Sequence, residues 1–181
     1  MKVIIIYGGN SSEKEISIKT GIAVNKSLQN TFDTKMVLVG DNYTIIKDFY
    51  SKGDIVFNGL HGGYGENGEL QAFFEEQDID FIGSGSKACQ VAIDKIKSKK
   101  VAESLGCLVP NGRIVNDIPD FKDFSIPFIV KPNQEGSSVG FNQIACEKDF
   151  KDALKLSKKH KNQLLAEEKI EGREITVPVL D

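Results

Sequence analysis

The residues Val3–Tyr7 form a continuous apolar run, Val-Ile-Ile-Ile-Tyr, which Gly8 and Gly9 end. Apolar side chains at every position are typical of a strand that is covered on both faces, as the central strands of parallel sheets are. Further strand signals appear at Lys35–Val39 and Asp54–Asn58. Because a helical pattern separates the first two runs, the order predicts an α/β fold that begins with a doubly wound parallel sheet.

The first helix is expected to start at Ser12, since Ser12 and Glu15 have the spacing of a capping box. Its predicted apolar face is formed by Ile16, Ala23, Val24 and Leu28. Ligands of such sheets bind beyond the carboxyl ends of the strands. Two loops should lie there, residues 8–14 and residues 59–68, and the second carries five glycines.

After Pro110 the pattern changes to short strands that leave few residues for parallel crossovers. An α+β layer is therefore expected, and the predicted domains are residues 1–96 and 97–181. Because the chain stops at Asp181 inside a strand pattern, we expect the second domain to be truncated. The predicted elements are strands at Gly112–Asn116, Pro127–Lys131, Val139–Ile144, Gln163–Glu167 and Ile175–Leu180, and a helix at Glu147–Lys161.

Composition excludes several classes of protein. The formal net charge of −3 gives no basic footprint for nucleic acid, and the first apolar run is too short for a signal peptide or a membrane span. Cys89, Cys107 and Cys146 show no CxxC spacing, so they are expected to be reduced, buried thiols of a cytoplasmic protein. Only His61 and His160 could join them in a zinc site, and no metal site is expected within this chain.

The segment Phe128–Phe141 is the best candidate for an anion site. An apolar strand delivers Lys131, Pro132 ends it, and a polar loop bounded by Gly136 and Gly140 follows. Glycines let a backbone approach a ligand, consecutive N–H groups and hydroxyls form an anion cradle, and a lysine ammonium suits phosphate. An ordinary surface hairpin with a polar loop explains the same residues equally well.

Three titratable residues fall in the two loops at the sheet edge. Glu13 lies in the first turn of the first helix, where stabilisation of the helix dipole explains it without any function. His61 and Glu66 share the glycine-rich loop, and glycines beside a histidine argue against a place in the core. A titratable group in a crevice loop is a candidate site residue.

Other charged residues also have two interpretations. Lys95 follows an apolar helical face and either extends its ammonium to solvent or pairs with an anion next to Lys131. Glu167, Glu168 and Glu174 form either a solvated turn or a site for a base and a ribose. Neither a Walker A loop nor a GxGxxG motif is present.

Together these motifs resemble the D-alanine–D-alanine ligase family of the ATP-grasp superfamily, in the same order along the whole chain. The segments that carry the resemblance are GGNSSEKEIS (8–17), HGGYGENGELQ (61–71), GSG (83–85), DK (94–95), VKPNQEGSSVG (130–140) and EEKIEGREITV (167–177). The resemblance implies a pre-ATP-grasp substrate domain followed by an incomplete ATP-grasp subdomain that acts as a lid.

The resemblance also implies a reaction. ATP phosphorylates one D-alanine, and the amine of a second D-alanine attacks the acyl phosphate to form D-alanyl-D-alanine for bacterial peptidoglycan. It implies a homodimer and Mg²⁺, whose ligands are expected beyond this chain, so that the fragment itself is expected to be inactive. A D-alanine–D-lactate ligase and a non-catalytic nucleotide-binding module remain the alternatives.

The resemblance assigns roles to individual residues. Glu13, oriented by Ser137, would hold the ammonium of the first substrate, with His61 near its carboxylate and Glu66 beside it. In the ATP site, Lys95 and Lys131 would contact the phosphates, and the loop of Gly136, Ser137 and Ser138 would close over them. The carboxylate of Glu167 and the backbone of Glu168, Lys169 and Ile170 would contact adenine. Glu174 would contact the ribose.

Overall fold

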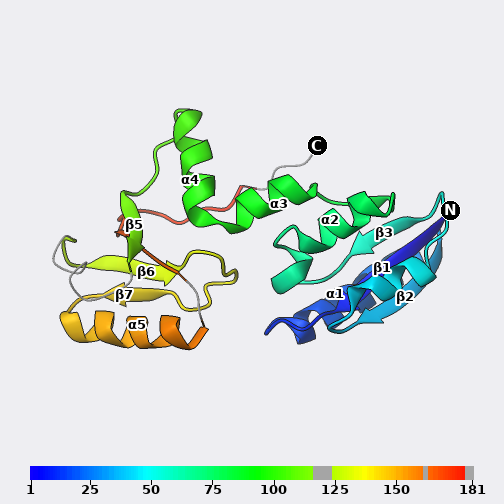
Figure 1. The fold of residues 1–181 in the computed structure, drawn as a ribbon, viewed down its shortest axis with the longest axis horizontal. Helices are drawn as coiled ribbons and strands as arrows, with labels where there is room; N and C mark the ends of the chain where they lie inside the picture. Colours follow the sequence, from blue (N-terminus) through cyan, green and yellow to red (C-terminus); the bar gives the residue numbers. More distant parts are fainter. Residues whose placement is uncertain (116–123, 161–162, 178–181) are drawn as a thin grey trace. The chain divides into compact units, whose positions relative to one another are not determined.

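The structure, a computed structural model, describes residues 1–115, 124–160 and 163–177. It divides into two compact units, Met1–Asp94 and Lys95–Asp181. Each unit contains one four-stranded sheet (Figure 1). The first sheet is parallel and the second antiparallel, which confirms a mixed α/β protein with both kinds of sheet.

The parallel sheet has the strand order β2-β1-β3-β4. Its strands are β1 (Lys2–Gly8), β2 (Asp33–Val39), β3 (Ile55–Asn58) and β4 (Phe81–Ile82). β1 pairs with both β2 and β3, and Ile4, Ile5 and Ile6 have no exposed surface. The apolar run is therefore a central strand covered on both faces, as predicted.

Helices pack on both faces of this sheet. The elements are α1 (Lys14–Leu28), α2 (Glu69–Glu76), α3 (Ser86–Ile93) and the 3-10 helices η1 (Tyr43–Asp48) and η2 (Gly63–Gly65). Ile4 and Ile6 belong to a core with Leu70 and Phe74 of α2. Alternate residues of a strand point to opposite faces, and Tyr7, on the face opposite Ile6, contacts Gly21 of α1.

The predicted start and apolar face of α1 are wrong in part. The helix begins at Lys14 after the N-cap Glu13, and no side chain caps it, so Ser12 and Glu15 form no capping box. Ile16 is 50% exposed and Ala23 is also exposed, whereas the buried residues are Ser17 and Gly21. A Cβ at Gly21 would lie only 2.6 Å from Tyr7 Cβ. Small residues face the sheet because the helix approaches it closely, and hydrophobicity alone does not predict this.

The antiparallel sheet has the strand order β5-β8-β6-β7. One face packs on α5, where Phe128, Val130 and Ala166 meet Phe150 and Leu154 in a second core. The elements of this unit are α4 (Lys95–Ser104), β5 (Gly112–Val115), β6 (Phe128–Pro132), β7 (Asn142–Ile144), α5 (Glu147–His160) and β8 (Leu164–Glu168).

Some predicted bounds in this unit differ from the structure. β7 begins at Asn142 rather than Val139, because residues 139–141 belong to the loop of the hairpin. Residues 175–177 form no strand, and residues 178–180 of that predicted strand lie outside the described residues, as do Asn116 and Lys161. Pro132 pairs with Leu164 as the last residue of β6, consistent with its predicted role in ending the strand.

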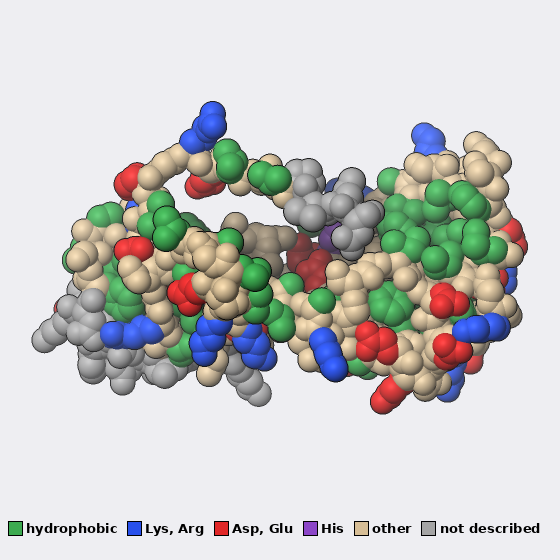
Figure 2. All heavy atoms as spheres, turned by 90° about the horizontal axis from the view of Figure 1, so that it is seen from above, with side chains coloured by type: hydrophobic (Ala, Val, Ile, Leu, Met, Phe, Trp, Pro, Cys, Tyr) green, Lys and Arg blue, Asp and Glu red, His purple; other side chains and the backbone are tan. Residues whose placement is uncertain are grey.

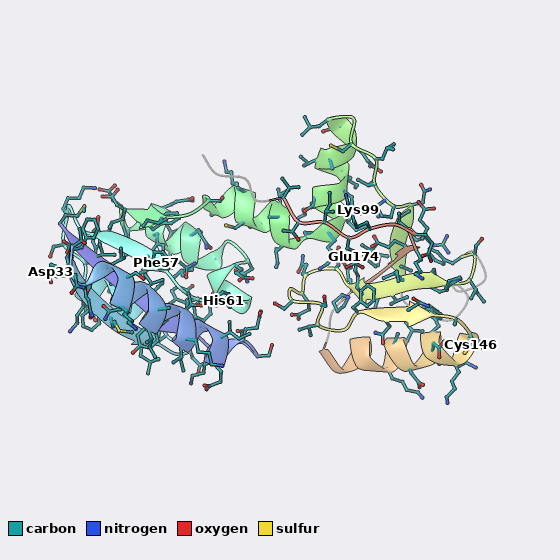
Figure 3. All side chains as sticks on the ribbon, turned by 180° about the vertical axis from the view of Figure 1, so that it is seen from behind. Asp33, Phe57, His61, Lys99, Cys146 and Glu174 are labelled. Atoms are coloured by element: carbon teal, nitrogen blue, oxygen red, sulfur yellow. The ribbon has the colours of Figure 1, made fainter. Side chains whose placement is uncertain are left out.

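The surface differs from the prediction at the cysteines. Cys107 and Cys146 are exposed, and Cys146 lies just before α5 (Figure 3). On the face shown in Figure 2, Lys and Arg side chains lie among Asp and Glu side chains and exposed hydrophobic groups. Within the described part of the chain, no helix combines the length and the apolar character needed to cross a membrane.

Candidate functional site

Ser17 joins the bases of the two loops at the carboxyl edge of the parallel sheet. Its hydroxyl accepts a hydrogen bond from Gly8 N at 2.8 Å and donates one to Gly59 O at 2.7 Å. The Ser17 side chain is fully buried. Because both hydrogen bonds are made inside the protein, Ser17 fixes the spacing between the ends of β1 and β3.

The same two loops meet again farther out. Ser11 donates a hydrogen bond to the carbonyl of His61 at 2.6 Å and accepts one from the N–H of Glu13 at 3.1 Å. Gly62, with φ of 66°, lies so close that a Cβ there would be 2.9 Å from a carboxylate oxygen of Glu13. The structure therefore brings Glu13 and the loop of His61 together, as predicted for the sheet edge.

His61 belongs to the glycine-rich loop and lies beside α1 (Figure 3). Its Nε2 is 2.9 Å from the hydroxyl of Thr20, and its Nδ1 is 3.7 Å from a carboxylate oxygen of Glu66. The side chain of His61 is 32% exposed, and that of Glu66 is 39% exposed. The imidazole is thus oriented on both sides and still reaches solvent, where a ligand can contact it.

Tyr64 holds the glycine-rich loop against the end of β2. Its hydroxyl donates a hydrogen bond to the carbonyl of Gly40 at 2.5 Å, and the ring belongs to the first core. Burial, with smaller effects from nearby Asp41 and Glu69, raises the pKa of Tyr64 to about 12. The hydroxyl therefore remains a neutral donor at physiological pH, and the loop is anchored beside its polar residues.

In the second unit, Lys95 joins α4 to the loop of the β6–β7 hairpin. Its backbone N–H donates to Asn133 O at 3.1 Å, and its ammonium donates to Glu135 O at 2.6 Å. The side chain of Asn133, which is 3% exposed, accepts a hydrogen bond from Ile96 N at 3.1 Å. Lys95 therefore lies at the base of the predicted anion cradle.

The hairpin loop, residues 133–141, has an unusual backbone. Ser137 and Ser138 have φ of 47° and 58°, and Gly140 has φ of 71°. A non-glycine residue in this left-handed region costs on the order of 1–2 kcal/mol. Such strain is concentrated at ligand-binding sites, where it is part of the mechanism. The loop from Gly136 to Gly140 is folded by turns, with Val139 N donating to Gly136 O at 2.9 Å.

Lys131 lies on β6 and contacts Glu167 of β8. Glu167 is only 5% exposed, and its other carboxylate oxygen is 3.0 Å from the ammonium of Lys99. Two predicted site residues, Lys131 and Glu167, are therefore directly paired. Lys99 completes the group from α4 (Figure 3).

Four further residues were predicted to bind the nucleotide, and they lie apart from this ion pair: Glu168, Lys169, Ile170 and Glu174. Glu168 accepts from Asn111 N at 2.9 Å, and alternation along β8 places its side chain on the face opposite Glu167. Lys169 pairs with Glu171 at 2.7 Å, whereas Ile170 is 63% exposed. Glu174 is exposed on the segment that follows β8 (Figure 3).

Sequence reasoning missed Thr20, Lys99 and Asn133. Lys99 follows Lys95 by one helical turn, and this i, i+4 spacing was a signal that both ammonium groups share one face of α4. Thr20 and Asn133 gave no such signal, since their roles depend on His61 and on the start of α4, both far away in the sequence.

Comparison with known proteins shows that the chain is similar to D-alanine–D-alanine ligases. Residues 116–181 match the family model described as the C-terminus of D-Ala-D-Ala ligase. The D-alanine–D-alanine ligase of Aquifex aeolicus is 39% identical over 184 residues, which cover 99% of this chain and 63% of that protein.

Two solved structures have the same fold over most of this chain. The D-alanine–D-alanine ligase of Bacillus anthracis superposes with a TM-score of 0.83 at 27% identity, covering 95% of this chain and 58% of that one. The same enzyme complexed with ATP gives a TM-score of 0.82 at 26% identity, covering 95% and 57%. The chain thus spans about three-fifths of the length of these relatives, and it is similar to D-alanine–D-alanine ligases over nearly all of its own length.

Proposed function

We propose that the protein of which this chain forms part joins two D-alanine molecules in an ATP-dependent reaction, releasing ADP and phosphate. Its relatives are named D-alanine–D-alanine ligases, and one solved relative holds ATP. The residues around Glu13 and His61 in the first unit, and those around Lys95 and Lys131 in the second, suit these substrates. We further propose that the protein is a cytoplasmic homodimer and that its product serves bacterial peptidoglycan synthesis.

The first unit would be a pre-ATP-grasp domain that holds the first D-alanine. Glu13, beside Gly62, has the negative charge that an α-ammonium group requires. His61 is held near it by the Ser11 hydrogen bond and would face the substrate carboxylate, with Glu66 supporting the imidazole from the Nδ1 side. Because each group is oriented by a second contact, little ordering is left to the moment of binding.

The second unit would be part of an ATP-grasp domain that holds the nucleotide. Lys95 and Lys131 would neutralise the phosphates, and the loop Gly136–Ser138 would close over them and orient Glu13 through Ser137. Adenine would meet Glu167 and the backbone of residues 168–170, and Glu174 would meet the ribose. Phosphoryl transfer depends mainly on position and charge neutralisation, and the acyl phosphate needs protection from water.

Mg²⁺ is expected for this chemistry, but residues for it are not found in this part of the protein. Across residues 1–115, 124–160 and 163–177, no three His, Cys, Asp or Glu side chains are grouped closely enough to hold a metal ion.

The observation that carries the proposal is the contact of Lys95 with Glu135 O, since it places a second ammonium at the loop that follows Lys131. An ammonium at a strained, hydroxyl-bearing loop, with Lys131 on the strand that leads into it, would suit a polyphosphate. The match over 99% of the chain to a D-alanine–D-alanine ligase, and the ATP held by one solved relative, support ATP as that polyphosphate.

The test is ADP release by the intact protein with and without D-alanine. ADP formation should depend on D-alanine and should not occur with L-alanine. Lys131→Ala should raise KM for ATP or lower kcat on the order of tenfold or more, since a phosphate cation is lost. The exposed Lys148 of α5 provides the control, because Lys148→Ala should have wild-type kinetics. ATP binding without any ADP formation would contradict ligation and favour a nucleotide-binding module.

A further inference from the structure

The carboxylate of Glu167 is shared by two lysines from different elements. Lys99 of α4 lies 3.0 Å from one carboxylate oxygen, and Lys131 of β6 contacts the other. Glu167 pairs with Ile129 and Lys131 pairs with Leu165 across β6 and β8, so Glu167 and Lys131 lie on the same face of the sheet. The core with α5 occupies the other face, and the face of Glu167 also carries the buried Ile129 and Leu165.

The position of Glu167 is also fixed from the neighbouring strand. Gly112 of β5 is paired with Glu167, and a Cβ there would lie 2.7 Å from the Cβ of Glu167. Only glycine leaves the carboxylate in this place. Since Glu167 is 5% exposed, most of its charge is compensated by the two ammonium groups rather than by water.

This arrangement has a consequence for phosphate binding. If Lys131 turns from Glu167 to a phosphate, the carboxylate loses one of its two cations. A buried carboxylate that has no cation is strongly destabilising. The carboxylate stays compensated only if Lys99 remains in contact with it, and the side chain of Lys99 is itself mostly buried, at 16% exposure.

We propose that Lys99 is a positioning residue that compensates and aims Glu167 while Lys131 exchanges this carboxylate for an ATP phosphate. The inference rests on the proposed function. Once Lys131 has left, the vacated carboxylate oxygen of Glu167 can accept a hydrogen bond from a purine amino group. The carboxylate repels a carbonyl oxygen at the same position, so the contact discriminates adenine from purines that carry a carbonyl there.

The experiment measures binding of ATP and of inosine triphosphate to the intact protein by calorimetry. Lys99→Met should weaken ATP binding on the order of tenfold, because Lys131 can then leave Glu167 only at the cost of an uncompensated buried charge. It should also lower the preference for ATP over inosine triphosphate. Lys99→Arg should restore both, and the exposed neighbour Lys100 supplies the matched control Lys100→Met, which should bind like wild type.

A double-mutant cycle separates positioning from a structural role. In a Glu167→Gln background there is no charge to compensate, so the added effect of Lys99→Met on ATP affinity should disappear. Wild-type ATP affinity in Lys99→Met, or an equal loss in both backgrounds, would overturn the proposal. If Lys99→Met does not fold, Lys99→Gln takes its place with the same expected results. Absence of ATP binding by the wild type would instead overturn the proposed function, and the inference with it.

Discussion

Glu13 is the residue whose charge matters most to the proposed first substrate site. Glu13→Gln keeps the shape of the side chain but removes the charge that would meet an ammonium group, so KM for D-alanine at the first site should rise on the order of tenfold or more. Initial-rate measurements over a range of D-alanine concentrations check this. Glu15→Gln is the matched control, since Glu15 is an exposed carboxylate in the first turn of α1. Unchanged dependence on D-alanine in Glu13→Gln would remove Glu13 from the site.

The sequence was informative for residues that stand in motifs and uninformative for residues that support them. Glu13 and His61 could be selected because they lie in glycine-bearing loops after strands, and the structure brings their loops together. Thr20 could not be selected as a site residue from the sequence, because nothing around it marks a threonine within a helix as special. Its role comes from the 2.9 Å contact with His61, which is far away along the chain. Supporting residues depend on tertiary neighbours, which periodicity does not reveal.

At the scale of elements, the approach of α1 to β1 is controlled by Gly21. A Cβ at this position would lie 2.6 Å from Tyr7 Cβ and 2.8 Å from its Cγ. Gly21→Ala should therefore lower the free energy of unfolding by about 1 kcal/mol, since overpacking costs about 2 kcal/mol and helix propensity returns roughly 1 kcal/mol. Urea unfolding measures the change.

Gly40 provides the control for this substitution. Nothing lies within 4 Å of a Cβ built at Gly40, so Gly40→Ala should leave the stability within about 0.5 kcal/mol of wild type. A Gly21→Ala protein as stable as wild type would mean that α1 can move away from the sheet without cost.

The contact between α2 and α3 should depend on pH. Glu75 of α2 accepts hydrogen bonds from the Ser86 hydroxyl at 2.6 Å and the Ser86 N–H at 2.7 Å, and these lower the pKa of the Glu75 carboxyl. A carboxyl whose pKa is lower in the folded state stabilises the fold above its unfolded pKa, and this stabilisation is lost as the pH falls through the folded value.

Glu75→Gln should therefore lower the melting temperature at pH 7, and the difference from wild type should shrink as the pH falls below the usual range of glutamate. Thermal melts between pH 3 and pH 7 give the comparison. Glu76→Gln is the control, because the neighbouring Glu76 makes no such contact with the start of α3. A constant difference across this pH range would show that Glu75 acts through shape rather than charge.

Strands were easier to predict than the buried faces of helices. The apolar run Val3–Tyr7 lies within β1, and the order of strands and helices follows the hydrophobic pattern. The buried face of α1 was predicted wrongly because the helix meets the sheet through Ser17 and Gly21, while Ile16 is exposed. When close approach rather than apolar area decides which face is buried, a hydrophobic pattern gives the wrong face.

At the scale of the whole molecule, each unit carries a core of its own. The first core consists of residues between Ile4 and Phe81, and the second of residues between Val115 and Ala166. Each unit also contains a sheet of its own. The change of pattern after Pro110 led to the expectation of two domains, 1–96 and 97–181, and the break between the compact units at Asp94 carries no proline or glycine that the sequence could have marked.

The first unit should therefore fold without the second. A polypeptide of residues 1–94 retains all members of the first core and all strands of the parallel sheet, and it should unfold in one cooperative transition in urea. A polypeptide of residues 1–76 is the matched control: it lacks β4 and the buried Ile79, so the edge of the sheet and part of the core are missing. Circular dichroism and the dispersion of amide resonances distinguish the two. A non-cooperative 1–94 polypeptide would mean that the first core and its sheet are not sufficient for this unit to fold.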